Sequence, residues 1–83
     1  MEKFVLTVTN NAGEATRDPV ECSTVTGVLL QCHPDIDHSH VQQVCDMAAA
    51  NPDYPYQIAA WKGTPESRYM CWSADLIFTK GNS

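Results

Sequence analysis

The stretch YMCWSADLIFT, residues 69–79, carries the clearest structural pattern in the chain. Apolar side chains occupy its even-numbered positions, which are Met70, Trp72, Ala74, Leu76 and Phe78. Its odd-numbered positions mix polar and apolar residues. Because successive side chains of a strand point to opposite faces of a sheet, this alternation predicts a strand with one packed face and one mixed face. If the even positions face the core, Tyr69 and Cys71 face away from it.

The preceding segment YQIAAWK, residues 56–62, is a second predicted strand. The sequence GTPES, residues 63–67, is rich in turn-forming residues and predicts that the two strands form a hairpin. Trp61 is out of phase with Tyr56 and Ile58 along this strand. Either Trp61 or the other two side chains therefore face away from the core, and the pattern leaves both alternatives open.

The beginning of the chain predicts another hairpin. Apolar residues alternate with Val5, Thr7 and Thr9 over residues 3–9, which indicates a half-buried strand. NNAG at residues 10–13 is a turn sequence. The return arm is expected within residues 14–22, where Pro19 lacks a backbone donor and so predicts an edge strand or a bulge.

Residues 23–33 are compatible with either a strand or a helix. The β-branched residues and Gly27 favour a strand. Four residues at helical spacing share one apolar face, namely Val25, Val28, Leu29 and Cys32. Ser23 is a suitable N-cap, and Pro34 disfavours helical geometry at the residue before it. We expect a short helix here.

A second helix is expected to follow. Ser39 and Gln42 have the spacing of a capping box, which makes His40 the first helical residue. The next residues again form an apolar stripe at helical spacing, consisting of Val41, Val44, Cys45 and Ala48. Asn51 followed by Pro52 predicts the end of this helix.

The order strand–strand–helix–helix–strand–strand predicts an α+β fold. We expect a two-layer sandwich in which two hairpins form a four-stranded antiparallel sheet. Two short helices are inserted between the hairpins and packed on one face of the sheet. Residues 1–83 are expected to form a single domain, with residues 80–83 as a frayed tail.

The net charge of −5 is unevenly distributed along the chain. Residues 18–61 contain six Asp and Glu residues and no Lys or Arg. Because nucleic acids and anionic membranes are bound through basic side chains, direct binding of either is disfavoured. The start MEKFVLTVTN lacks the apolar length of a secretory signal, and no apolar run is long enough to span a membrane. We therefore expect a cytoplasmic protein with reduced cysteines.

CHPDIDHSH, residues 32–40, contains all three histidines and is a candidate metal or catalytic site. Adjacent Cys32 and His33 diverge in any regular structure, and the chain has no paired C-x-x-C or H-x-x-x-H ligand spacing. Consecutive Asp37, His38 and Ser39 cannot normally converge as a catalytic triad. We therefore expect no metal, no other cofactor and no enzymatic activity. Acidic residues just before a helix also have a simple structural role, because they stabilise the helix N-terminus.

The acidic segment is followed by NPDYPY, residues 51–56, in which two tyrosines flank a stiffening proline. Tyr and Trp are the side chains most enriched at binding hot spots. The sequence therefore suggests a partner-binding surface composed of acidic and aromatic residues. The candidate residues are Asp35, Asp37, Asp46, Asp53, Tyr54, Tyr56, Trp61 and Tyr69.

The function expected from this surface is stoichiometric docking on a protein partner with a basic surface, such as a nucleic-acid-binding complex of a host cell. Small acidic single-domain proteins without motifs are typical of phage and mobile-element inhibitors of host defence, including anti-CRISPR proteins. The likeness is one of size and charge, with no shared motif. The alternative is a small Cys/His regulator that binds a metal or senses redox state. A homodimer joined by sheet edges is compatible with either function.

Overall fold

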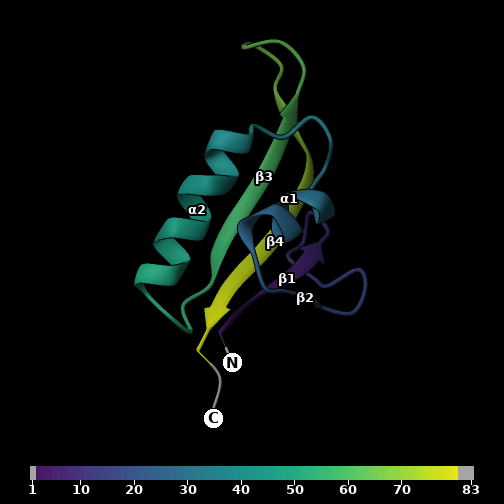
Figure 1. Ribbon diagram of the computed structural model, residues 1–83. Helices are drawn as coiled ribbons and strands as arrows, with labels where there is room; N and C mark the ends of the chain where they lie inside the picture. Colours follow the sequence, from purple (N-terminus) through teal and green to yellow (C-terminus); the bar gives the residue numbers. More distant parts are fainter. Residues whose placement is uncertain (1, 81–83) are drawn as a thin grey trace.

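The predicted strand at residues 69–79 lies inside the sheet and pairs with a neighbour on each side. The structure is a computed structural model that describes residues 2–80 (Figure 1). Among these residues it forms one four-stranded antiparallel sheet, with strand order β2-β1-β4-β3. The strand β4 (Tyr69–Thr79) pairs with β1 (Lys3–Thr9) on one side and with β3 (Tyr56–Lys62) on the other. The short strand β2 (Val20–Cys22) forms the far edge beside β1.

The inner face of the sheet and the two helices α1 (Val25–Gln31) and α2 (His38–Ala50) share one hydrophobic core. From the sheet, the even-numbered positions Leu6, Ile58 and Leu76 are fully buried, as the alternation predicted. From α2, the predicted stripe is buried, namely Val41, Val44, Cys45 and Ala48. The predicted α+β fold, with a four-stranded antiparallel sheet and two helices, is confirmed. In the described part of the chain, neither helix is long and apolar enough to cross a membrane.

The first hairpin is less regular than the sequence suggested. The predicted return arm at residues 14–22 forms a strand only at Val20–Cys22, together with an isolated bridge between Thr9 and Ala15. Asn10 tightens the intervening turn, because its side-chain Oδ1 accepts hydrogen bonds from two backbone amides at 2.9 and 3.0 Å. Pro19 immediately precedes the short strand, and β2 is an edge strand of the sheet, as the proline predicted.

The segment at residues 23–33 forms the short helix α1, but Ser23 is not its N-cap. Thr24 has the extended backbone of a capping residue, and its Oγ1 accepts a hydrogen bond from Gly27 N at 3.0 Å. The apolar stripe is placed as expected. Val28 is fully buried, whereas Val25, Leu29 and Cys32 are half-buried against the core.

The predicted capping box of α2 is wrong. The helix begins at His38, and Asp37 is its N-cap, with Oδ1 accepting from Ser39 N at 2.9 Å. Gln42, which the box would require to reach back to Ser39, instead donates to Asp46 Oδ1 at 2.9 Å. The helix ends at the predicted place, since Asn51 is its C-cap.

The β3–β4 hairpin contains a bulge that the alternation pattern did not reveal. Ala60 pairs with Trp72, but the next residue Trp61 pairs with Met70, so Cys71 is the extra residue on β4. Paired residues of neighbouring strands lie on the same face. Tyr69 pairs with Lys62, which is in phase with Ala60 of the core face. The prediction that Tyr69 faces away from the helices is therefore wrong.

The bulge does not change the phase of β3 itself. Ile58 is fully buried, and Trp61 is half-exposed on the opposite face, which decides between the two alternatives that the sequence left open. The predicted tail at residues 80–83 begins after β4, with Lys80 outside the strand. Its remainder, residues 81–83, lies outside the described residues.

Candidate partner-binding surface

Six of the eight predicted binding residues lie around α2, whereas Trp61 and Tyr69 lie on the β3–β4 hairpin, so the eight do not form one compact patch. Asp35 and Asp37 precede the helix, and Asp53, Tyr54 and Tyr56 follow it. The 13 residues of α2 separate these two groups by about 20 Å, at a rise of 1.5 Å per residue. Asp46 lies between them on the exposed surface of the helix.

The loop before α2 is fixed to the β3–β4 hairpin. Asp35 Oδ2 lies 3.5 Å from the Lys62 ammonium nitrogen at the end of β3. Ile36 is buried in the core, which holds the loop from beneath. His33 Nδ1 lies 3.1 Å from Asp35 N and accepts its hydrogen bond, which ties the histidine ring to the loop backbone. The same nitrogen lies 3.8 Å from Asp35 Oδ2.

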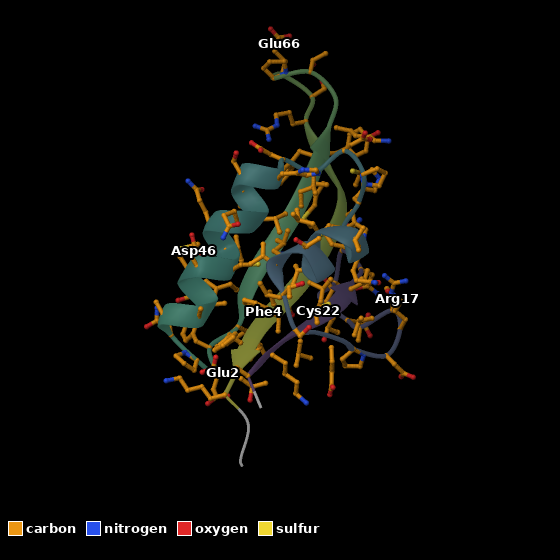
Figure 2. The ribbon with its side chains drawn as sticks, viewed as in Figure 1. Glu2, Phe4, Arg17, Cys22, Asp46 and Glu66 are labelled. Atoms are coloured by element: carbon orange, nitrogen blue, oxygen red, sulfur yellow. The ribbon has the colours of Figure 1, made fainter. Side chains whose placement is uncertain are left out.

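Asp37 and Asp46 have different structural roles. The Asp37 carboxylate caps the helix, where its negative charge also interacts favourably with the helix dipole. Asp46 is exposed, and Figure 2 shows it on the side of α2 that faces away from the sheet. Arg17, in the loop between β1 and β2, lies on the far side of the molecule in the same view. Asp46 can therefore meet a partner without first breaking an ion pair.

The turn after α2 holds two tyrosines in a fixed arrangement. Asp53 has a positive φ of 67°, and its N–H donates to Phe78 O at 2.8 Å, which attaches the turn to the end of β4. The rings of Tyr54 and Tyr56 lie 5.1 Å apart with an interplanar angle of 54°. Tyr56 packs partly against the core, and its hydroxyl accepts from Asn51 Nδ2 at 2.9 Å. Tyr56 therefore supports Tyr54, which is 60% exposed.

A separate aromatic site lies on the β3–β4 hairpin, which extends beyond the helices in Figure 1. Trp61 is half-exposed, and the Arg68 guanidinium carbon lies 5.3 Å from its ring centroid. These two side chains line a shallow hollow of about 340 Å³. The sequence did not indicate Arg68 as part of this site, because Arg68 approaches Trp61 only when the hairpin turn brings the two strands together. Tyr69 is also exposed, but it lies on the opposite face of the hairpin from Trp61.

Four carboxylates and one tyrosine thus lie on the exposed side of α2 and at its two ends. We call this surface the acidic side, and define it as Asp35, Asp37, Asp46, Asp53 and Tyr54. Of its four carboxylates, Asp35 is the one that lies within ion-pair distance of a lysine or arginine among the described residues. The acidic side therefore carries net negative charge over a length comparable to that of the helix.

The cysteines lie in or beside the core. Cys22 and Cys45 are buried and Cys32 is half-buried, with its thiol donating to Val28 O at 3.2 Å. Burial raises the pKa of Cys45 from 9.0 to about 11, with smaller contributions from Cys32, Asp46 and Cys22. Burial, together with Cys22, also raises the pKa of Cys32 to about 11. Because the thiolate is the nucleophile and the metal ligand, neither residue is activated for such chemistry near neutral pH.

The histidine-rich loop does not bring together a metal-ligand set. Among residues 2–80, no group of three or more His, Cys, Asp or Glu side chains is arranged to hold a metal ion. His38 and His40 lie in the first turn of α2, and His33 is bonded to the loop backbone. Comparison with known proteins found no match, whether to a protein-family model, to a curated protein or to a solved structure.

Proposed function

We propose that the protein acts by stoichiometric docking of its acidic side on a basic surface of a protein partner. The observation that carries this proposal is the combination of carboxylates along α2 with Tyr54, an exposed ring held in place by Tyr56. An anchor that is already ordered loses little conformational entropy on binding. The carboxylates would attract the partner, and Tyr54 would hold it.

The partner class suggested by this surface is a nucleic-acid-handling protein or complex, because such proteins present basic surfaces to phosphates. A small inhibitor that occupies such a surface needs a stable fold and a complementary charge, without catalytic groups. Inhibitors of host defence carried by phages and mobile elements, including anti-CRISPR proteins, work in this general way. We assign the protein to this functional class as a proposal, with the cytoplasm of the host cell as the place where it would act.

The proposal is tested by measuring how Tyr54→Ala changes the complex. Candidate partners are captured on the immobilised protein, and the dissociation rate of each is then measured for the wild-type and variant proteins. If Tyr54 is the central anchor, its loss raises the dissociation rate by roughly thirtyfold, which corresponds to about 2 kcal/mol. The fold is not expected to change, because Tyr54 is exposed.

Tyr69→Ala is the matched control for this experiment. Tyr69 is 57% exposed, which is close to the value for Tyr54, but it lies on the β3–β4 hairpin and is not one of the residues that define the acidic side. The variant should dissociate at the wild-type rate. The reverse result, with Tyr69 important and Tyr54 neutral, would move the interface to the hairpin and contradict the proposed surface.

A further inference from the structure

The outer edge of β3 is unpaired along its whole length. In the strand order β2-β1-β4-β3, β3 has β4 as its one neighbour. Within residues 2–80, no backbone group outside the β3–β4 ladder forms a hydrogen bond with Tyr56–Lys62. The N–H and C=O groups of alternate β3 residues therefore point outward from the sheet without a protein partner.

The two edges of the sheet differ in how well they are protected against pairing with another strand. At the far edge, β2 has 3 residues, follows Pro19 and carries Glu21, which pairs with Lys3 at 2.9 Å. By contrast, β3 has 7 residues, no proline and one charge, on its last residue Lys62. The bulge of this hairpin lies on β4 and leaves β3 regular. Short strands, prolines and charges are the usual protection of an edge, and β3 lacks them over its central residues.

We propose that two copies of the chain pair through β3 in antiparallel orientation, about a two-fold axis at Ala59, and so form a continuous eight-stranded sheet. This register pairs Tyr56 with Lys62 of the second copy and Gln57 with Trp61. Ile58 then pairs with Ala60, and Ala59 with its own counterpart. No like charges face each other, and the small Ala59 side chains meet at the axis, where bulk would be least tolerated.

The position of α2 fits this dimer. The helix packs across both β3 and β4, so its axis lies roughly half a strand spacing inside β3. With strands about 4.8 Å apart, the two copies of α2 would lie about 10 Å from each other. This agrees with the distance of about 8–10 Å at which helices pack. The paired strands thus bring the helices into contact without any change in the fold.

The side of α2 that would meet its counterpart carries an apolar residue. α1 packs against β2 and α2, so it lies on the β2 side of α2, and its C-cap Cys32 packs against the core cluster that includes Cys45. Met47 lies on the other side of the buried stripe, next to Val44, and is therefore directed toward the free edge of β3. It is 45% exposed in the single chain, and the dimer would cover it.

The dimer is tested first by mass. Sedimentation or light scattering of the wild-type protein should give twice the 9.2 kDa chain mass at high concentration and one chain mass on dilution. Because each chain carries a net charge of −5, the dimer should become tighter as salt screens the repulsion. A single-chain mass at every concentration and salt level would overturn the proposal.

Crosslinking then tests the register. In a background in which Cys71 is replaced by Ser, Ala59→Cys should form a disulfide between two chains under mild oxidation, because opposite residues of paired strands are about 5 Å apart at Cβ. Thr7→Cys, also half-buried on the same face but in an inner strand, is the control and should not crosslink. A wild-type dimer that is not crosslinked through residue 59 would overturn the β3 pairing.

A charged double variant provides the complementary test. Ala59→Lys combined with Met47→Lys places like charges opposite each other at both the strand and the helix contacts, and should yield a folded monomer. Circular dichroism of this variant must match that of the wild-type protein. A folded double variant that still forms the dimer as tightly as the wild type would also overturn the proposal.

Discussion

Asp35 Oδ2 lies 3.5 Å from Lys62 Nζ, and this contact joins the loop between the helices to the end of β3. Both side chains are about half-exposed, so water and salt weaken their attraction. We expect Lys62→Met to lower the free energy of unfolding by no more than about 1 kcal/mol, with the difference disappearing at high salt. Denaturant unfolding at low and high salt measures this. A larger, salt-independent loss would show that the loop depends on Lys62 in another way.

The N-cap of α2 provides a sharper test of the local structure. Because Asp37 caps the helix, Asp37→Ala should lower the free energy of unfolding by about 1 kcal/mol, whereas Asp37→Asn should be nearly neutral. Ser39→Ala should cost little, since Ser39 contributes only its backbone N–H to the cap. The reverse order, with Ser39→Ala the more costly substitution, would restore the capping box suggested by the sequence.

Stability should fall at high pH because of the buried thiols. The pKa of Cys45 is raised from 9.0 to about 11 in the folded protein, so the unfolded chain loses this proton first. Well below pH 9, Cys45 is protonated in both the folded and the unfolded chain, so its ionisation does not affect the free energy of unfolding. As the pH rises from about 9 to 11, the free energy of unfolding decreases. Cys45→Ala should have a smaller decrease than the wild-type protein. Val44→Ala, which removes side-chain volume from the same stripe but no titratable group, should keep the wild-type slope.

Metal analysis tests the assignment of the histidine-rich segment. Protein purified without chelator should contain well below one zinc ion per chain, and EDTA should leave its melting temperature unchanged, because the potential ligands do not converge. Stoichiometric zinc that is lost together with the fold would contradict this expectation. The first residues to substitute would then be Cys32, His38, His40 and Cys45.

Apart from β2, the strands and helices could be predicted because each has a periodic apolar pattern. Alternation placed β3 at 56–62 and β4 at 69–79, and the 3.6-residue stripe gave the buried face of α2. The caps could not be placed as well, because Asp37 and Ser39 are both good capping residues. The choice depends on which of them takes the extended backbone, and Asp37 does, with φ −72° and ψ 120°.

The spatial arrangement of the candidate residues was predicted less completely than the fold. Local sequence grouped Asp53 with Tyr54 correctly, since both lie in one turn. Local sequence could not reveal that Tyr69 and Trp61 lie on opposite faces of the hairpin. The alternating pattern of residues 69–79 contains no signal for the bulge that reverses the faces. The stacking of Arg68 on Trp61 also depends on pairing across the hairpin, which a single strand does not encode.

The most direct test of the proposed docking surface is the association rate of the captured partner with Asp46→Lys and Glu14→Lys. Both substitutions reverse one exposed carboxylate, but Asp46 lies on the acidic side and Glu14 lies in the loop between β1 and β2. Electrostatic steering predicts that the wild-type association rate falls as salt rises, and that Asp46→Lys slows association more than Glu14→Lys at low salt. Equal effects of the two variants, or association that does not depend on salt, would contradict docking through the acidic side.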